Sequence, residues 1–133
     1  MPNWTGLVRH PMFPDENVTP FTESNTASAA TNTVTLAAVP GRRIAISRIV
    51  ATSGVAGGVT AADLTVTNIV KKDGTAGTVT YRYVANTTGA PGLVVDAGQQ
   101  PLLAVAENTQ VVVSLGSIAA TTTALEVTGF LVG

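Results

Sequence analysis

The side chains that most often carry out chemistry are sparse in this sequence. His10 is the only histidine, and there is no cysteine. A catalytic triad, a histidine-rich metal site or a thiolate nucleophile therefore cannot be assembled. Because His10 stands between Arg9 and Pro11 in a proline-rich stretch, we interpret it as an exposed or interface imidazole. The sequence predicts no metal site.

The eight carboxylates form no recognisable catalytic pair. A glycosidase needs two carboxylates that face each other across a cleft. Asp73 and Asp96 stand in turn sequences, where aspartate is a common turn former, and Asp63 precedes a predicted strand. The other carboxylates are Asp15, Glu16, Glu23, Glu107 and Glu126. We therefore expect no enzymatic activity and no cofactor.

Tyr81, Arg82 and Tyr83 form the pattern closest to a ligand site. Aromatic side chains that share one strand face can stack on sugar rings, so a carbohydrate-binding β-sandwich module stays open as an alternative. Aromatic residues make up only 5% of the chain, and core packing is the more economical use for two of them. The glycines of SGVAGGVTAADL, at 53–64, lack the spacing and the Lys-Ser/Thr ending of a phosphate-binding loop.

Charge is unusually low along the whole chain. Charged residues make up 11% of the sequence, compared with about 25% in ordinary soluble domains. The surface must then consist largely of Thr, Ser, Asn, Gly and Ala, and we expect partners to cover part of it. The net charge is −1 and the basic residues are scattered, so nucleic acid is not expected as a partner. No segment resembles a signal peptide or a membrane span, so we expect no membrane association.

Residues 1–31 are predicted to form an extended N-terminal arm. The segment contains four prolines and no sustained hydrophobic period, which excludes a helix or a central strand. It also carries aromatic and apolar residues that a disordered tail would lack. We expect the arm to bind a neighbouring subunit, with packing on its own domain as the alternative. The residues predicted to bind a partner are Trp4, Leu7, Arg9, Phe13 and Phe21.

Residues 32–133 are predicted to form a β-sandwich. Short β-prone runs alternate with Gly, Pro, Asn and Asp turns, and this pattern is typical of a jelly-roll-like sandwich of about eight antiparallel strands in an all-β domain. An up-and-down barrel is the alternative. In the run 43–52, simple alternation places Ile44 and Ile49 on opposite faces, so we expect both faces of that strand to be covered. The predicted strands are 33–37, 43–52, 63–70, 78–85, 92–95, 102–105, 109–115 and 123–132.

Three segments add a family resemblance: Pro40-Gly41-Arg42-Arg43-Ile44, the run ENTQVVVSL at 107–115, and the closing VTGFLV at 127–132. In this order they resemble the β-sandwich decoration (cement) proteins of tailed-bacteriophage heads, over about residues 38–133. The resemblance implies a jelly-roll domain, made in the host cytoplasm, that binds the outer surface of the virion capsid. It implies major capsid protein as a partner, bridging of its subunits to stabilise the shell, and a homo-oligomer, either a trimer or a dimer. Another virion accessory module, such as a head fibre base or a tail protein, is the alternative.

Overall fold

Two antiparallel sheets make up the computed structural model, which describes residues 8–10, 13–54, 61–84, 92–98, 100–118 and 121–133, with side chains from Val18 onward. The described residues contain strands and turns but no helix, and therefore no helix that could cross a membrane. The strands are β1 (Val8–His10), β2 (Phe13–Ser28), β3 (Asn32–Leu36), β4 (Arg43–Ser53), β5 (Ala61–Val70), β6 (Ala76–Val84), β7 (Leu93–Asp96), β8 (Leu102–Leu103), β9 (Val111–Leu115) and β10 (Thr122–Val132).

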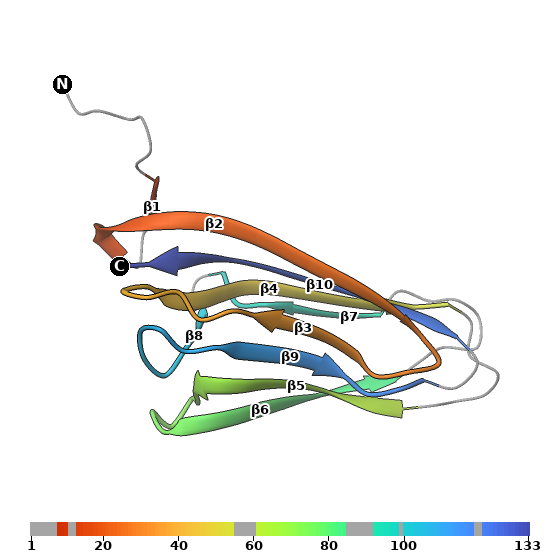
Figure 1. The fold of residues 1–133 in the computed structure, drawn as a ribbon. Coiled ribbons are helices and arrows are strands. Elements are labelled where there is room, and N and C mark those ends of the chain that lie inside the picture. The colour runs from red at the N-terminus through yellow and green to blue at the C-terminus, as the bar shows by residue number, and fades with distance from the viewer. Residues whose placement is uncertain (1–7, 11–12, 55–60, 85–91, 99, 119–120) are drawn as a thin grey trace.

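Four nested strand pairs define the topology. β2 pairs with β10, β3 with β9, β4 with β7, and β5 with β6, all antiparallel. Successive pairs alternate between a sheet of order β1-β2-β10-β4-β7, with β8 also on β4, and a sheet of order β3-β9-β5-β6. A long hairpin rolled up in this way is a jelly roll. The predicted all-β, jelly-roll-like sandwich is therefore confirmed, and Figure 1 shows its two layers face to face.

The main core fills the space between the two sheets. β3 and β9 show the period of two that a half-buried strand requires, with every second side chain buried. The largest fully buried apolar side chains include Ile44, Ile46, Ile49, Leu64, Ile69, Leu115, Ile118 and Leu125. Burial of these side chains, at about 1.5–3 kcal/mol each, is the main force that holds the layers together.

A β-bulge in β4 brings the large apolar residues on either side of it onto the same face of the strand. Thr128 and Gly129 of β10 skip Ser47 when they pair with β4. The Ser47 hydroxyl donates to the Thr128 carbonyl at 3.0 Å. The residues that face the main core on either side of the bulge are Ile44, Ile46, Ile49 and Ala51. The predicted alternation, which placed Ile44 and Ile49 on opposite faces, is wrong because this one extra residue shifts the period.

A second, smaller apolar cluster lies on the other face of the six-stranded sheet. It contains Val18, Ala45, Phe130 and Val132, with Leu103 packed against it. On β10, Phe130 and Val132 alternate with Leu131, which packs against the main core, so they point the opposite way. Val18 pairs with Val132. From Val18 onward, the even-numbered residues of β2 therefore lie on the sheet face that points away from the main core.

Residues 13–28 belong to the sandwich as strand β2 rather than to a separate arm. β2 pairs with β10 from Val18 to Ser28. The short strand β1 pairs with β2 at two positions, Val8 with Val18 and His10 with Phe13. The backbone is extended, as predicted, but residues 18–28 lie beside β10 in the six-stranded sheet, whereas the predicted sandwich starts at residue 32. Pro20 pairs with Phe130 of β10, but beyond Val18 the other side of β2 has no strand partner among the described residues. Proline is accepted in such edge strands.

Candidate functional site

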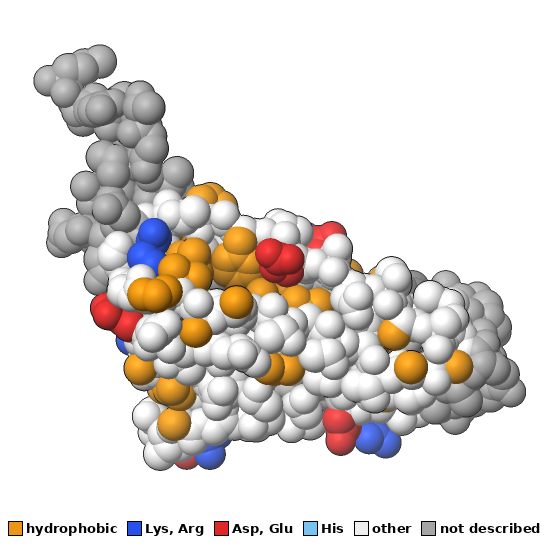
Figure 2. Space-filling view, viewed as in Figure 1, with side chains coloured by type: hydrophobic (Ala, Val, Ile, Leu, Met, Phe, Trp, Pro, Cys, Tyr) orange, Lys and Arg blue, Asp and Glu red, His pale blue; other side chains and the backbone are white. Residues whose placement is uncertain are grey.

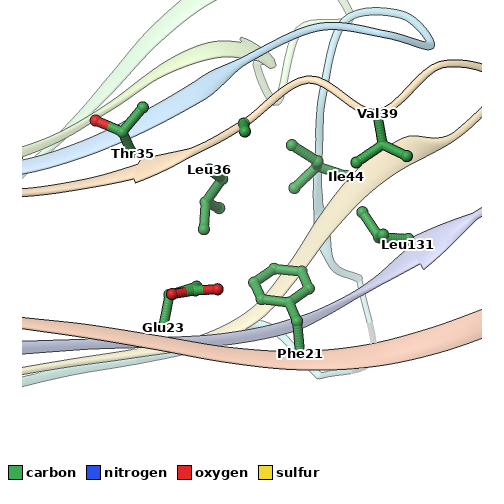
Figure 3. Close-up of a pocket in the computed structure, with 8 residues that line it drawn as sticks. Phe21, Glu23, Thr35, Leu36, Val39, Ile44 and Leu131 are labelled. Atoms are coloured by element: carbon green, nitrogen blue, oxygen red, sulfur yellow. The ribbon is translucent and has the colours of Figure 1, made fainter.

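A groove opens between β2 and β3, where one edge of each sheet meets the other. We call it the β2–β3 groove. Its volume is about 250 Å³, and the residues that line it are Phe21, Glu23, Thr35, Leu36, Ala37, Val39, Ile44 and Leu131. Figure 2 shows hydrophobic side chains gathered on this side of the molecule beside acidic atoms. Figure 3 shows Phe21 and Glu23 directed from β2 toward Leu36 and Ile44.

Phe21 owes its position in the groove to a glycine on the neighbouring strand. Phe21 pairs with Gly129 of β10, and a Cβ atom on Gly129 would lie 2.9 Å from Phe21 Cζ. The aromatic ring covers the space that a side chain would otherwise occupy, a known way to stabilise glycine in a sheet. Arg42 Nη2 donates to the Leu131 carbonyl at 2.8 Å and to the Thr19 hydroxyl at 3.1 Å, which ties β10 to β2 beside the groove.

Among the described residues, Glu23 is the one charged residue that lines the β2–β3 groove. Its side chain is exposed, and the ion pair found among the described residues joins Arg82 to Asp63 instead. The groove thus combines apolar walls with two polar side chains, the Glu23 carboxylate and the Thr35 hydroxyl. A ligand with a large apolar body and one or two polar groups would match both features.

The residues predicted to bind a partner are only partly described. Phe21 is half-buried and packs against the main core of its own chain, so its ring is a wall of the groove rather than a free anchor. Arg9 lies in β1 and Phe13 begins β2, but their side chains are not described. Trp4 and Leu7 lie outside the described residues, and their predicted role stays a prediction.

The described carboxylates at turns have structural partners. Asp73 Oδ1 accepts hydrogen bonds from the Thr75 hydroxyl at 2.6 Å and the Thr75 amide at 3.0 Å, and these bonds lower the pKa of Asp73. Asp96 Oδ1 accepts from the Gly98 amide at 3.2 Å. Their predicted use as turn formers is confirmed. Within the part of the chain that the structure describes, no three His, Asp or Glu side chains are grouped to hold a metal ion.

The two tyrosines do not form a stacking platform for a sugar. Tyr83 is only 2% exposed, and its hydroxyl donates to Ser53 Oγ at 2.7 Å. Tyr81 is half-buried and packs against the main core. The economical interpretation, core packing, holds for both residues. A carbohydrate site built on this pair is therefore not formed.

The position of Tyr81 predicts a loss of stability at alkaline pH. Burial raises the pKa of Tyr81 above its ordinary value, so the unfolded chain loses the phenol proton first as pH rises. The stabilisation is fully present below about pH 10 and declines as pH rises through the folded pKa. Urea unfolding between neutral pH and about pH 11 should show a smaller loss of stability for Tyr81→Phe than for the wild type. Equal losses would contradict the assignment.

The outer face of the four-stranded sheet is rich in hydroxyl groups. On the four-stranded sheet, one row crosses all four strands through Thr33, Ser114, Thr65 and Thr80. The exposed Arg82–Asp63 pair on the same sheet joins β6 to β5 at 2.9 Å. The large apolar residues exposed among the described ones are Val84 at 58% and Val94 at 51%. Exposed charged side chains also lie on the six-stranded sheet, where Arg48 of β4 pairs with Asp96 of β7 and Glu126 lies on β10.

Comparison with known proteins does not identify a family. A scan against protein-family models finds no match, and a search of curated proteins finds no relative.

Proposed function

We propose that this chain is a structural virion protein that binds the outside of a virus head as a decoration protein. In this role it would bridge subunits of the major capsid protein and self-associate into a small homo-oligomer. It would use surface contacts and no catalytic chemistry.

The observation that carries the proposal is the row of threonine and serine side chains across the outer face of the four-stranded sheet, in a chain of which only 11% of the residues are charged. Threonine and serine rows on twisted sheets offer neutral surface that can be desolvated at moderate cost and can form hydrogen bonds across an interface. A free monomer usually stays soluble through interspersed surface charge. Such a surface favours a chain that spends its functional life covered by other protein.

Stabilisation of a shell needs only preferential binding to the assembled state. A protein that binds across the seam between capsomers, and binds separated capsomers less well, shifts the equilibrium toward the intact shell. Each tenfold difference in affinity between the two states is worth about 1.4 kcal/mol per bound copy. Many copies on one shell would add these small terms together. A rigid jelly roll suits this role because little conformational entropy is lost when it docks.

Co-sedimentation with stripped heads tests the proposal. Purified full-length protein should pellet with mature heads of the encoding virus from which accessory proteins have been removed. The bound amount should saturate at a fixed ratio to the major capsid protein. Heads of an unrelated virus are the matched control and should pellet none. A bound amount that rises without saturation, or that is equal on both kinds of head, would contradict specific decoration.

A further inference from the structure

Strand β6 forms an open edge of the four-stranded sheet. It is the last strand of that sheet, and among the described residues no strand pairs with its outer side (Figure 1). Its nine residues contain no proline, lysine or carboxylate, and the extra residue in its irregular pairing with β5 belongs to β5. Edge strands usually carry such protective features, because an open row of amides and carbonyls pairs readily with another chain. The outer side of β6 is therefore suited to strand pairing.

The other edge strands among the described residues are short or contain proline. On the six-stranded sheet, β2 contains Pro14 and Pro20, β1 has three residues and β7 has four. At the opposite edge of the four-stranded sheet, β3 has five residues. Short strands and proline are both common protections of a sheet edge. In the described part of the chain, β6 thus provides the longest edge that lacks them.

The hydrogen-bond ladder shows which backbone groups of β6 point outward. The Gly116 amide donates to the Asp63 carbonyl at 3.1 Å, so Asp63 directs its backbone groups toward β9. The backbone groups of successive residues alternate between the two neighbouring strands, so Leu64 directs its own toward its β6 partner, Tyr81. The same alternation leaves three central residues of β6 with their amides and carbonyls on the outer side: Thr78, Thr80 and Arg82.

We propose that β6 pairs antiparallel with β6 of a second copy, about a two-fold axis at Thr80. Thr80 of each copy then faces Thr80 of the other, and Arg82, the one charged residue of β6, faces Thr78. Each pair brings outward-pointing amides and carbonyls together, as the reciprocal hydrogen bonds of an antiparallel pair require. The contact closes as a dimer, because both copies use the same surface. This inference rests on the self-association that the proposed function includes, and it names the contact responsible.

The length and side chains of β6 select this register. Thr80 is the midpoint of the strand, so an axis there pairs all nine residues, whereas any shift leaves part of the edge unpaired. The exposed Val84 comes to lie opposite the exposed Ala76 of the second copy, and Tyr81 opposite Val79. Aromatic and β-branched side chains are favourable cross-strand partners. The register therefore covers apolar surface and brings no like charges together.

The dimer would extend the row of hydroxyl side chains on the outer sheet face. In one copy this row runs through Thr33, Ser114, Thr65 and Thr80. Pairing at Thr80 joins it end to end with the same row of the second copy, in one continuous sheet. At about 4.8 Å per strand, the combined row would span about 34 Å. Dimerisation would thus double the neutral surface that the proposed function uses.

Substitutions at the axis test the contact without any capsid present. Thr80→Lys and Thr80→Glu should each weaken dimerisation of the full chain about tenfold in analytical ultracentrifugation, because each places two like charges opposite each other. An equal mixture of the two variants should recover the dimer, since the introduced lysine and glutamate then face each other. Thr33→Lys is the matched control, because it makes the same change at the far end of the hydroxyl row, and it should leave dimerisation unchanged.

Three results of this experiment would each overturn the proposal. The first is a wild-type protein that stays monomeric at every concentration. The second is an oligomer that the Thr80 variants leave intact or that Thr33→Lys weakens equally. The third is a mixture that associates no better than either Thr80 variant alone. Thermal unfolding of all variants checks that the sandwich is intact.

Proline substitution tests the direction of the backbone groups. The Thr80 amide points outward, so Thr80→Pro should fold and melt close to the wild type but stay monomeric, because the dimer loses two hydrogen bonds. Tyr81→Pro is the control, because it removes an amide directed at β5 and should destabilise the sandwich strongly. Equal destabilisation by the two substitutions would contradict the proposed edge. Dimerisation and binding to stripped heads are measured separately, so either proposal can fail alone.

Discussion

Replacement of Asn32 by alanine is expected to lower the free energy of unfolding by about 3 kcal/mol. Asn32 is 0% exposed, and its Nδ2 donates to the Asn25 carbonyl at 3.0 Å and to the carbonyl and hydroxyl of Thr123, each at 3.1 Å. Asn25 Nδ2 donates back to Asn32 Oδ1 at 2.9 Å. This network joins β3 of one sheet to β2 and β10 of the other, so alanine would leave several polar groups without partners.

Chemical denaturation with and without the substitution measures this effect. Ser28→Ala is the matched control because it removes an exposed bond from the same corner of the fold, between Ser28 and Thr122 hydroxyls 2.8 Å apart. The control should change stability by less than about 0.5 kcal/mol. A similarly small change for Asn32→Ala would show that the buried network does not hold the two sheets together.

Gly129→Ala is expected to destabilise the protein by about 3 kcal/mol. A Cβ atom at this position would overlap the Ala45 carbonyl oxygen and would lie 2.9 Å from Phe21 Cζ. The backbone oxygen belongs to the neighbouring strand β4 and cannot move without disturbing the ladder beside the bulge. The free-energy cost of this clash exceeds the stabilisation of roughly 0.5–1 kcal/mol that alanine otherwise gives over glycine inside a strand.

A lowered melting temperature, by about 10 °C, is the expected observation for Gly129→Ala. Gly98→Ala is the control, because the nearest atom to a Cβ there, Asp96 Oδ1, lies at an ordinary 3.4 Å. The control should melt close to the wild type. A Gly129→Ala protein with unchanged melting would mean that β4 and β10 adjust to the methyl group without strain.

Local sequence patterns predicted much of this fold because its strands from β3 onward alternate or lie between clear turns. Each of the eight strands predicted from residue 33 onward overlaps one of the strands β3 to β10. β2 escaped prediction because Pro14 and Pro20 interrupt it and its outward-facing residues are small and polar. An edge strand tolerates these features, but nothing within the segment itself reveals that β10 lies beside it.

Features that depend on long-range pairing were not accessible from the sequence. The bulge at Ser47 reverses which side chains of β4 face the main core on its two sides. It is recognisable only from the register between β4 and β10. Phe21 was predicted to bind a partner, but its position against Gly129, which joins residues more than 100 positions apart, was not predicted. The sequence did not indicate that Glu23 lines a groove, because the groove forms only when β3 brings Leu36 close to β2.

The most direct test of the decoration role is a titration of stripped, DNA-filled heads with purified protein, followed by measurement of the temperature at which DNA is released. The proposal predicts that the release temperature rises with the number of bound copies and reaches a plateau when binding saturates. If the protein fails to bind at micromolar concentration, or binds to saturation without any change in release temperature, the cement role is contradicted.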